Sequence, residues 1–416
     1  MPKESPSREA ATLDSRLKRL GRISDERGVT TRTFLSPAMG RASALVGKWM
    51  RKAGLSVRQD GVGNLIGRRE GPGTGSKTLL LGSHLDTVRD AGRFDGALGV
   101  LLPIAALEIV GRRGIVLPFA VEVLGFSEEE GVRFSSAYLG SKGYTGKLRK
   151  SDLRLRDPEG ICVGDALARH NGRKTPLPRA AHAPGELLGY VEAHIEQGPV
   201  LEARGVAAGV VPSIAGQTRA RITFVGSAGH AGTTPMRLRR DALAGAAEFI
   251  LEVEHHARAC PPLVATVGCI AAQPGAANVI PGRVEVSLDV RHPVDSRRRA
   301  AFAGLQLAGR QIARRRGLSF SVEVTQDNRA VACSRELTAL LARSVRSRQG
   351  SCPAVPSGAG HDGVVLSSLT PVTMLFIRCR KGLSHHPDEY VHPRDLAVGL
   401  DILVDFLARL ASLHAR

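Results

Sequence analysis

The chain has 416 residues, of which 43% are hydrophobic and only 4% aromatic, so we expect one large or two ordinary domains with a core built on Ala, Leu and Val. It shows neither a signal peptide nor an apolar run of about 18 residues, which predicts a soluble cytoplasmic protein without a membrane partner. The formal net charge of +19 comes from dispersed basic residues without a zinc-finger, RNA-binding or basic-tail motif, which favours a solvated basic surface over nucleic-acid binding.

Strands and helices alternate along most of the chain. The expected elements, in order, are helices over 11–26 and 40–54, a strand pair within 57–67, a strand over 78–82, a helix over 96–111, strands over 119–126, 189–196 and 372–379, and a last helix over 394–413. This alternation is typical of an α/β fold in which a mostly parallel sheet carries helices on both faces. Pro103 is expected to kink or shorten the helix that contains it.

Residues 216–327 follow a different rhythm. The expected elements there are a strand over 218–225, a helix over 238–258, strands over 263–272 and 283–291, a helix over 296–316 and a strand over 318–325. This β-α-β-β-α-β order is typical of a ferredoxin-like α+β domain. We therefore predict that 216–327 are inserted into a larger domain made of 1–215 and 328–416.

The first candidate site residues follow the buried strand over 78–82. His84 could bind a metal, and Asp86, on the same strand face, could accept the other ring N–H of His84. Asp95 precedes a helix, where it could bridge two metal ions or simply cap the helix. Histidine with carboxylates is the ligand set of a hydrolytic zinc or manganese centre, although His84 and Asp86 alone could also be a hydrogen-bonded surface pair.

Further polar side chains follow other predicted strands. In the acidic run 128–130, one carboxylate could bind a metal while its neighbour acts as general base, or the run could be a solvated turn. His194 and either His385 or His386 also lie near strand ends. Because the carboxyl ends of parallel strands meet at one edge of a sheet, we expect these side chains to gather there.

Two residues of the inserted domain are candidates for substrate contact. His230 lies in the glycine-rich turn 226–235, which could also be a phosphate-binding loop, although it lacks the GK[ST] signature. Arg291 ends a predicted strand and could bind a carboxylate through two hydrogen bonds, or it could be one more surface arginine.

Eight motifs in order carry a family resemblance. They are Gly-Ser-His-Leu-Asp (82–86), Phe-Asp-Gly (94–96), Ser-Glu-Glu-Glu-Gly (127–131), His-Ile-Glu-Gln-Gly-Pro (194–199), Gly-His-Ala-Gly-Thr-Thr-Pro (229–235), Asn-Val-Ile-Pro-Gly (278–282), Ser-Gly-Ala-Gly-His-Asp (357–362) and Ser-His-His-Pro-Asp-Glu (384–389). With them the chain resembles the amidase/hydantoinase/carbamoylase branch of the dinuclear metallopeptidase clan. Members of this branch include N-carbamoyl-L-amino acid hydrolases, allantoate amidohydrolases and β-ureidopropionases.

The resemblance implies a role for each matching residue. Two divalent ions (Zn, Mn, Co or Ni), with Asp95 bridging them, would be held by His84, Asp95, Glu130, His194 and His385. Glu129 would be the general base, and Asp86 would orient His84. The substrate contacts would come from Gln197, His230, Asn278, Arg291 and Gly360. Among these, Arg291 would pair with the substrate α-carboxylate and His230 would polarise the scissile carbonyl.

The implied activity is hydrolysis of a linear non-peptide C–N bond in an anionic N-carbamoyl (ureido) amino acid or allantoate-like substrate, by a metal-bridging hydroxide with a Glu general base. The alternatives are a dipeptidase or N-acyl-amino acid deacylase of the same clan and, in a different class, a non-enzymatic basic nucleic-acid-binding protein on this fold. The resemblance also implies that the inserted domain is a lid and dimerisation domain, so that a homodimer is expected in which a partner residue could complete each site.

Overall fold

The structure, a computed structural model, describes residues 8–73, 75–172, 179–183 and 185–415. The chain divides into two compact units. Unit 1 comprises Met1–Pro212, Cys333–Val355 and His361–Arg416, and unit 2 comprises Ser213–Ala332 with the short segment Pro356–Gly360. The sequence predicts an insertion over 216–327, and it gives no indication that a second segment returns to unit 2.

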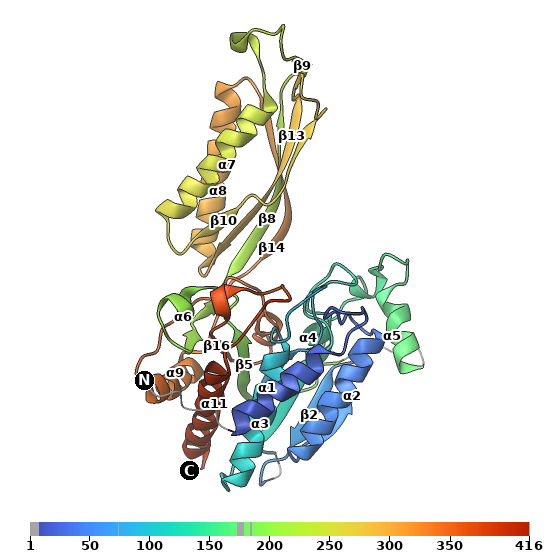
Figure 1. Ribbon diagram of the computed structural model, residues 1–416, viewed down its shortest axis with the longest axis vertical. Helices are drawn as coiled ribbons and strands as arrows, with labels where there is room; N and C mark the ends of the chain where they lie inside the picture. The colour runs from blue at the N-terminus through green and yellow to red at the C-terminus, as the bar shows by residue number, and fades with distance from the viewer. Residues whose placement is uncertain (1–7, 74, 173–178, 184, 416) are drawn as a thin grey trace. The chain divides into compact units, whose positions relative to one another are not determined.

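A seven-stranded sheet forms the centre of unit 1 (Figure 1). From one edge to the other, its strands are β1 (Ser56–Gln59), β2 (Leu65–Arg69), β4 (Ala120–Phe126), β3 (Thr78–His84), β5 (Leu187–Ile195), β16 (Val372–Ile377) and β6 (Ala208–Val211). The neighbours β4, β3, β5 and β16 are parallel, whereas the strand pairs β1–β2, β2–β4 and β16–β6 are antiparallel. The predicted α/β fold with a mostly parallel sheet is confirmed.

The helices of unit 1 pack on this sheet. Five of them share one apolar core with it: α1 (Arg8–Gly21), α2 (Pro37–Lys52), α3 (Ala97–Arg112), α9 (Arg335–Gln349) and α11 (Pro393–His414). The shorter helices are α4 (Leu139–Tyr144), α5 (Val163–Asn171), α6 (Val200–Ala203), α10 (Gly363–Leu366), η1 (Asp152–Arg154) and η3 (Arg380–Gly382). In β3, Leu79 and Leu81 belong to the shared core, so the alternate positions that end with His84 face the other side of the sheet.

Helix α3 connects the sheet to the candidate site, because it begins directly after Asp95 and Gly96. It continues through Pro103, so the expected shortening does not occur. A proline inside a helix costs about 3 kcal/mol. Every residue from Ala97 to Leu107 is buried, and this packing offsets the missing hydrogen bond.

Unit 2 places two helices on an antiparallel sheet. The strands lie in the order β10 (Val264–Thr266), β13 (Arg283–His292), β8 (Gly216–Val225) and β14 (Ser319–Asn328), and β11 (Ile270–Gln273) also pairs with β13. The helices α7 (Ala242–Ala259) and α8 (Asp295–Arg315) share an apolar core with the sheet. The remaining elements are β7 (Ser213–Ile214) with β15 (Val331–Ala332), β9 (Gly229–His230) with β12 (Val279–Ile280), and η2 (Met236–Leu238).

The order of elements in unit 2 agrees with the predicted pattern, with two local differences. The strand expected over 263–272 is two short strands, β10 and β11, which pair with opposite ends of β13. Helix α7 begins at Ala242 because the carboxylate of Asp241 accepts the backbone N–H groups of Leu243 and Ala244, at 2.9 and 3.1 Å. Across the described ranges of both units, no helix has the length and apolar character needed to cross a membrane.

Candidate active site

The carboxyl ends of the parallel strands in unit 1 carry the predicted ligands. His84 ends β3, the acidic run 128–130 follows β4, His194 lies one residue before the end of β5, and His385 lies in the segment after β16. Because these strands are neighbours in one sheet, residues from distant parts of the sequence meet at its edge.

Two histidines and one aspartate form a buried group. His84 Nε2 and His194 Nε2 lie 3.4 and 3.2 Å from the same oxygen, Oδ1 of Asp95. The two imidazole rings are stacked with centroids 5.8 Å apart. Each ring also directs Nδ1 at a backbone carbonyl, that of Asp86 at 3.0 Å and that of Ile195 at 2.9 Å. With the proton on Nδ1, each Nε2 presents a lone pair toward the group, and that of His194 accepts the backbone N–H of Gly96 at 3.3 Å.

The other oxygen of Asp95 is held by two further segments. Its Oδ2 accepts hydrogen bonds from Gln197 Nε2 at 2.9 Å and from Ser384 Oγ at 2.5 Å. The N-cap of α3 is Gly96, and no side chain caps this helix end. Asp95 therefore does not have the capping role that its sequence position allowed, and both of its oxygens face the site.

A second group shares Asp95 with the first. His385 Nε2 lies 3.5 Å from Asp95 Oδ2 and 3.5 Å from Glu130 Oε1. His386 is turned away, with its Nδ1 accepting the backbone N–H of Asp388 at 3.1 Å. The geometry thus brings His385 to the group and not its neighbour. The backbone of His385 has a φ of 56°, a left-handed conformation that costs a non-glycine residue energy and is often found at functional sites.

Asp86 positions the acidic run more directly than it positions His84. Its carboxylate accepts the backbone N–H groups of Glu129 at 3.0 Å and Glu130 at 3.1 Å. The ring of His84 points Nδ1 at the backbone carbonyl of Asp86, and the carboxylate lies 3.4 Å away. Glu129 and Glu130 form a third group with His84, whereas Glu128 belongs to none of the candidate metal groups among the described residues.

Burial and neighbouring charges shift the protonation of this site strongly. Burial, with the negative charge of Asp95, raises the pKa of Glu130 to about 8, although His84 acts in the opposite direction. Burial likewise raises the pKa of Glu129 well above its ordinary value, against the effect of His84. Burial alone would also raise the pKa of Asp95, but His194 and His84 hold it well below its ordinary value. A crowded set of buried carboxylates of this kind is stabilised by cations.

The donor set fits divalent metal ions. The candidate groups are His84, Asp95 and His194; His84, Glu129 and Glu130; and Asp95, Glu130 and His385, and within each group the ligand atoms lie within 4.8 Å of one another. Imidazole nitrogens with carboxylate oxygens suit zinc, manganese, cobalt and nickel. Because Asp95 belongs to two groups through different oxygens, its carboxylate can reach two neighbouring positions.

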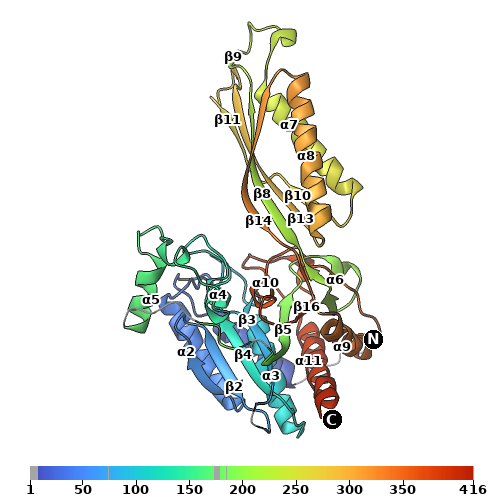
Figure 2. The ribbon, with the colours of Figure 1, turned by 180° about the vertical axis from the view of Figure 1, so that it is seen from behind.

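The candidate substrate residues of unit 2 lie at two separate places. His230 and Asn278 are brought together where β9 pairs with β12, since the carbonyl of Asn278 accepts the N–H of Ala231 at 2.9 Å. Arg291 instead lies near the other end of β13, paired with Val264 of β10. Figure 2 shows β9 and β10 at opposite ends of the sheet of unit 2. One copy of unit 2 therefore does not bring His230 and Arg291 together.

Arg291 is fixed by its neighbours in unit 2. Its Nε and Nη2 donate to the two oxygens of Asp289 at 3.0 and 2.9 Å, and its Nη1 donates to the carbonyl of Gly358 at 2.7 Å. These residues line a cavity of about 520 Å³. Gly360 is exposed in the same returning segment, 356–360. Gln197, by contrast, lies in unit 1, bonded to Asp95.

Two residues that support the site had no role in the sequence prediction. Glu389 Oε1 accepts the backbone N–H groups of Phe94 and Asp95, at 2.8 and 3.0 Å. Ser384 binds the side chain of Asp95 and also lies 3.3 Å from Glu389 Oε2. Both lie close to His385 in the motif Ser-His-His-Pro-Asp-Glu, and this closeness to a candidate ligand was the only signal in the sequence that they support the site.

The comparison with known proteins identifies the family. A family model described as Peptidase family M20/M25/M40 matches residues 80–409, and the chain belongs to this family. Enzymes of this family are metal-dependent, in agreement with the candidate metal-binding residues.

The similarity to individual proteins extends over nearly the whole chain. It is 43% identical to an allantoate deiminase of Arabidopsis thaliana, over 94% of this chain and 80% of that protein. It is 40% identical to an N-carbamoyl-L-amino acid amidohydrolase of Geobacillus stearothermophilus, over 96% of this chain and 98% of that protein. The crystal structure of an amidase of the hydantoinase/carbamoylase family from Burkholderia multivorans is similar with a TM-score of 0.91 and 32% identity, covering 99% of each chain.

Proposed function

We propose that this protein is a metal-dependent amidohydrolase that cleaves a linear non-peptide C–N bond in an N-carbamoyl amino acid or allantoate-like substrate. The observation that carries the proposal is the pair of candidate metal groups that share Asp95. The full-length similarity to an allantoate deiminase and an N-carbamoyl-L-amino acid amidohydrolase supports the substrate class.

Two divalent ions would be held at this site. Asp95 would lie between them, with His84, His194, Glu130 and His385 as the remaining ligands. When bound, such ions acidify water and polarise a carbonyl oxygen. A ureido carbonyl is stabilised by resonance and is a poor electrophile, so its hydrolysis needs both effects.

Glu129 would carry the proton during the reaction. Its side chain lies in the group that contains His84 and Glu130, where it could take a proton from the attacking water and return it to the departing nitrogen. Asp86 would keep Glu129 in position, because it accepts the backbone N–H of Glu129 at 3.0 Å. For a carbamoyl substrate the products would be an amino acid, ammonia and carbon dioxide.

Residues of unit 2 would bind the substrate. Arg291 would pair with the substrate carboxylate, because a guanidinium can donate two parallel hydrogen bonds to it. Asp289 and Gly358 hold this guanidinium in place. Gly360 of unit 2 and Gln197 of unit 1 would make further contacts. His230 would polarise the scissile carbonyl and Asn278 would contact the substrate.

Unit 2 would act as a lid and as the dimerisation domain. His230 and Asn278 lie at the opposite end of β13 from Arg291, so we infer a homodimer in which each substrate is bound by Arg291 of one subunit and by these two residues of the other. Such a two-fold arrangement is the commonest oligomeric symmetry.

The test is an assay of the full-length protein loaded with Mn, Co, Zn or Ni. The substrates are a panel of N-carbamoyl-L-amino acids, ureidopropionate and allantoate, with dipeptides and N-acetyl amino acids as comparison compounds. We expect turnover in the first set, and none with the Glu129→Gln variant. Turnover of only the dipeptides or N-acetyl compounds would replace this proposal with a peptidase or deacylase, and metal-loaded protein inactive on the whole panel would refute it.

A further inference from the structure

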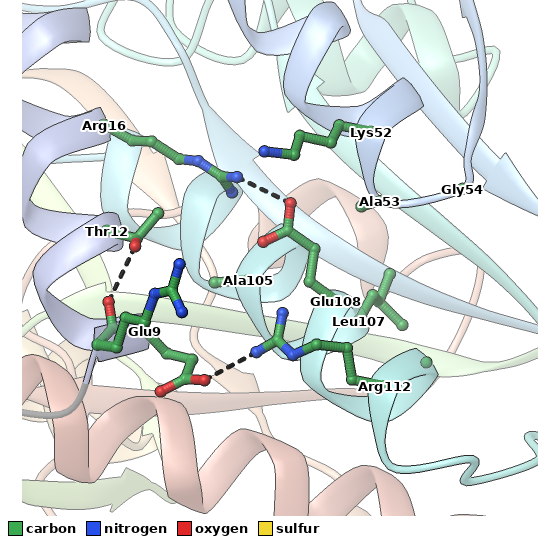
Figure 3. A pocket seen from close by; sticks show the side chains of 12 residues that line it. Glu9, Thr12, Arg16, Lys52, Ala53, Gly54, Ala105, Leu107, Glu108 and Arg112 are labelled. Atoms are coloured by element: carbon green, nitrogen blue, oxygen red, sulfur yellow. Dashed lines mark hydrogen bonds and ion pairs between the residues drawn. The ribbon is translucent and has the colours of Figure 1, made fainter.

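A second cavity, of about 570 Å³, lies among helices α1, α2 and α3 of unit 1 (Figure 3). The residues that line it are Arg8, Glu9, Thr12, Arg16, Lys52, Ala53, Gly54, Ala105, Leu107, Glu108, Gly111 and Arg112. It lies along the second half of α3, whereas Asp95 precedes the first residue of that helix. From the start of α3 to Glu108 the helix axis rises about 16 Å, so the cavity is separate from the candidate metal groups.

The residues that line this cavity carry more positive than negative charge. Its two acids are already paired, with Arg16 Nη2 lying 2.8 Å from Glu108 Oε1 and Arg112 Nη2 lying 2.9 Å from Glu9 Oε1. Four basic and two acidic side chains leave a formal charge of +2. Among the described residues, none forms an ion pair with Lys52.

Arg16 adds a buried positive charge to this lining. The residue is buried, with an exposed fraction of 7%, and its Nη1, which is closed to solvent, has no hydrogen-bond acceptor among the described residues. Burial makes the charge of this guanidinium costly, and an anion bound in the cavity would reduce that cost. Figure 3 shows Arg16 and Lys52 directed toward one another across the cavity.

Helix dipoles do not explain the whole cluster. Basic residues in the last turn of a helix are common because they offset its negative end, and this accounts for Lys52 in α2 and Arg112 in α3. Arg16 lies farther from the end of α1 and is buried against the ring of Trp49, with its guanidinium carbon 5.7 Å from the ring centre. The helix dipole therefore does not explain the charge that Arg16 adds to the lining.

We propose that this cavity binds a small dianion, either a phosphate monoester or a dicarboxylate. Two negative charges would match the formal charge of the lining, and the exposed ammonium of Lys52 would supply charged hydrogen-bond donors beside the buried charge of Arg16. The volume is in the range of small-molecule sites. The proposal does not depend on the proposed hydrolytic function.

Binding in this cavity can be followed by the fluorescence of Trp49. Trp49 is the only tryptophan in the sequence, and it contacts the guanidinium of Arg16. The experiment is a titration of the metal-loaded full-length protein with inorganic phosphate and with malonate, against sodium chloride at equal ionic strength, followed by tryptophan fluorescence. We expect a saturable change with at least one dianion and none with chloride. Saturation with phosphate alone indicates a phosphate monoester, and saturation with malonate alone indicates a dicarboxylate.

Two variants test whether the anion binds in this cavity. Lys52→Gln removes an exposed charge from the lining, and it is expected to weaken binding about fivefold to tenfold. Lys48→Gln removes the same charge from an exposed position of α2 that does not line the cavity, and it should bind like the wild type. The proposal is wrong if no dianion saturates the signal, if chloride gives the same change, or if Lys52→Gln binds as tightly as Lys48→Gln.

Discussion

The length of β13 provides a sharp test of how the substrate is bound. His230 and Asn278 lie near the Arg283 end of this strand, and Arg291 lies near the other end. Eight residue steps of about 3.4 Å separate Arg283 from Arg291, or about 27 Å. A ureido amino acid is much shorter than this, so His230 and Arg291 of one subunit cannot bind the same substrate molecule.

The perturbation is a pair of single variants, Arg291→Ala and His230→Ala. Each alone is expected to lose about a hundredfold or more in kcat/KM, because each removes a contact worth about 3 kcal/mol. When the two variants are unfolded together and refolded in equal amounts, half of the dimers should contain one chain of each kind. One site in each mixed dimer would lack both residues and the other would be intact, so about a quarter of the wild-type activity should return.

Two controls accompany the mixing experiment. If Arg291 and Glu129 of one site belong to the same subunit, a mixture of Arg291→Ala with Glu129→Gln should stay inactive, because each site of the mixed dimer then lacks one required residue. Light scattering of the mixture should give the mass of a dimer. If Arg291→Ala and His230→Ala form mixed dimers and no activity returns, the inference that two subunits share each site is refuted.

Three further outcomes are expected. Glu129→Gln should lower kcat by about a thousandfold or more with the metal content, measured by atomic emission, unchanged. Burial would raise the pKa of Glu122, but hydrogen bonds, led by that of His182, lower it from 4.5 to about 2. The ionised carboxylate therefore stabilises the fold fully above pH 4.5, and this stabilisation is lost as the pH falls toward 2. Glu122→Gln should therefore cost about 3 kcal/mol in urea unfolding at pH 7 and less than half of that near pH 3. Asp289→Asn should raise KM about tenfold with a smaller effect on kcat, since Asp289 orients Arg291; an unchanged KM would contradict that role.

The ends of β3 and β4 were predictable from the sequence because each is a run of apolar residues that is followed by polar ones. The apolar run that becomes β3 and the run that becomes β4 are fully buried, and each is followed directly by polar residues. Parallel pairing of these strands then places His84 and the acidic run 128–130 at one edge. The positions of these candidate ligands thus follow from two apolar runs in the sequence and from the rule that the carboxyl ends of parallel strands share one edge of the sheet.

The contacts that position those ligands could not be predicted in the same way. Asp86 holds backbone groups of residues more than forty positions away, and Glu389 holds the backbone of Asp95 from nearly the other end of the chain. A side chain that binds a distant backbone N–H leaves no periodic signal in the sequence. Helix α9, of 15 residues, is also absent from the prediction, although its signals, a capping Ser334 and an apolar stripe, are present in the sequence.

The shared position of Asp95 has a consequence for the stability of unit 1. The candidate ligands come from four separate segments, and in the unfolded chain these segments are far apart in sequence. Ions that bind only the folded arrangement add RT ln(1 + [L]/Kd) to its stability, about 4 kcal/mol at a thousandfold excess over Kd. The metal supply would thereby decide both how fast the enzyme turns over and how long each molecule survives, because a chain without bound metal would also lack a link between β3, β4, β5 and the segment after β16.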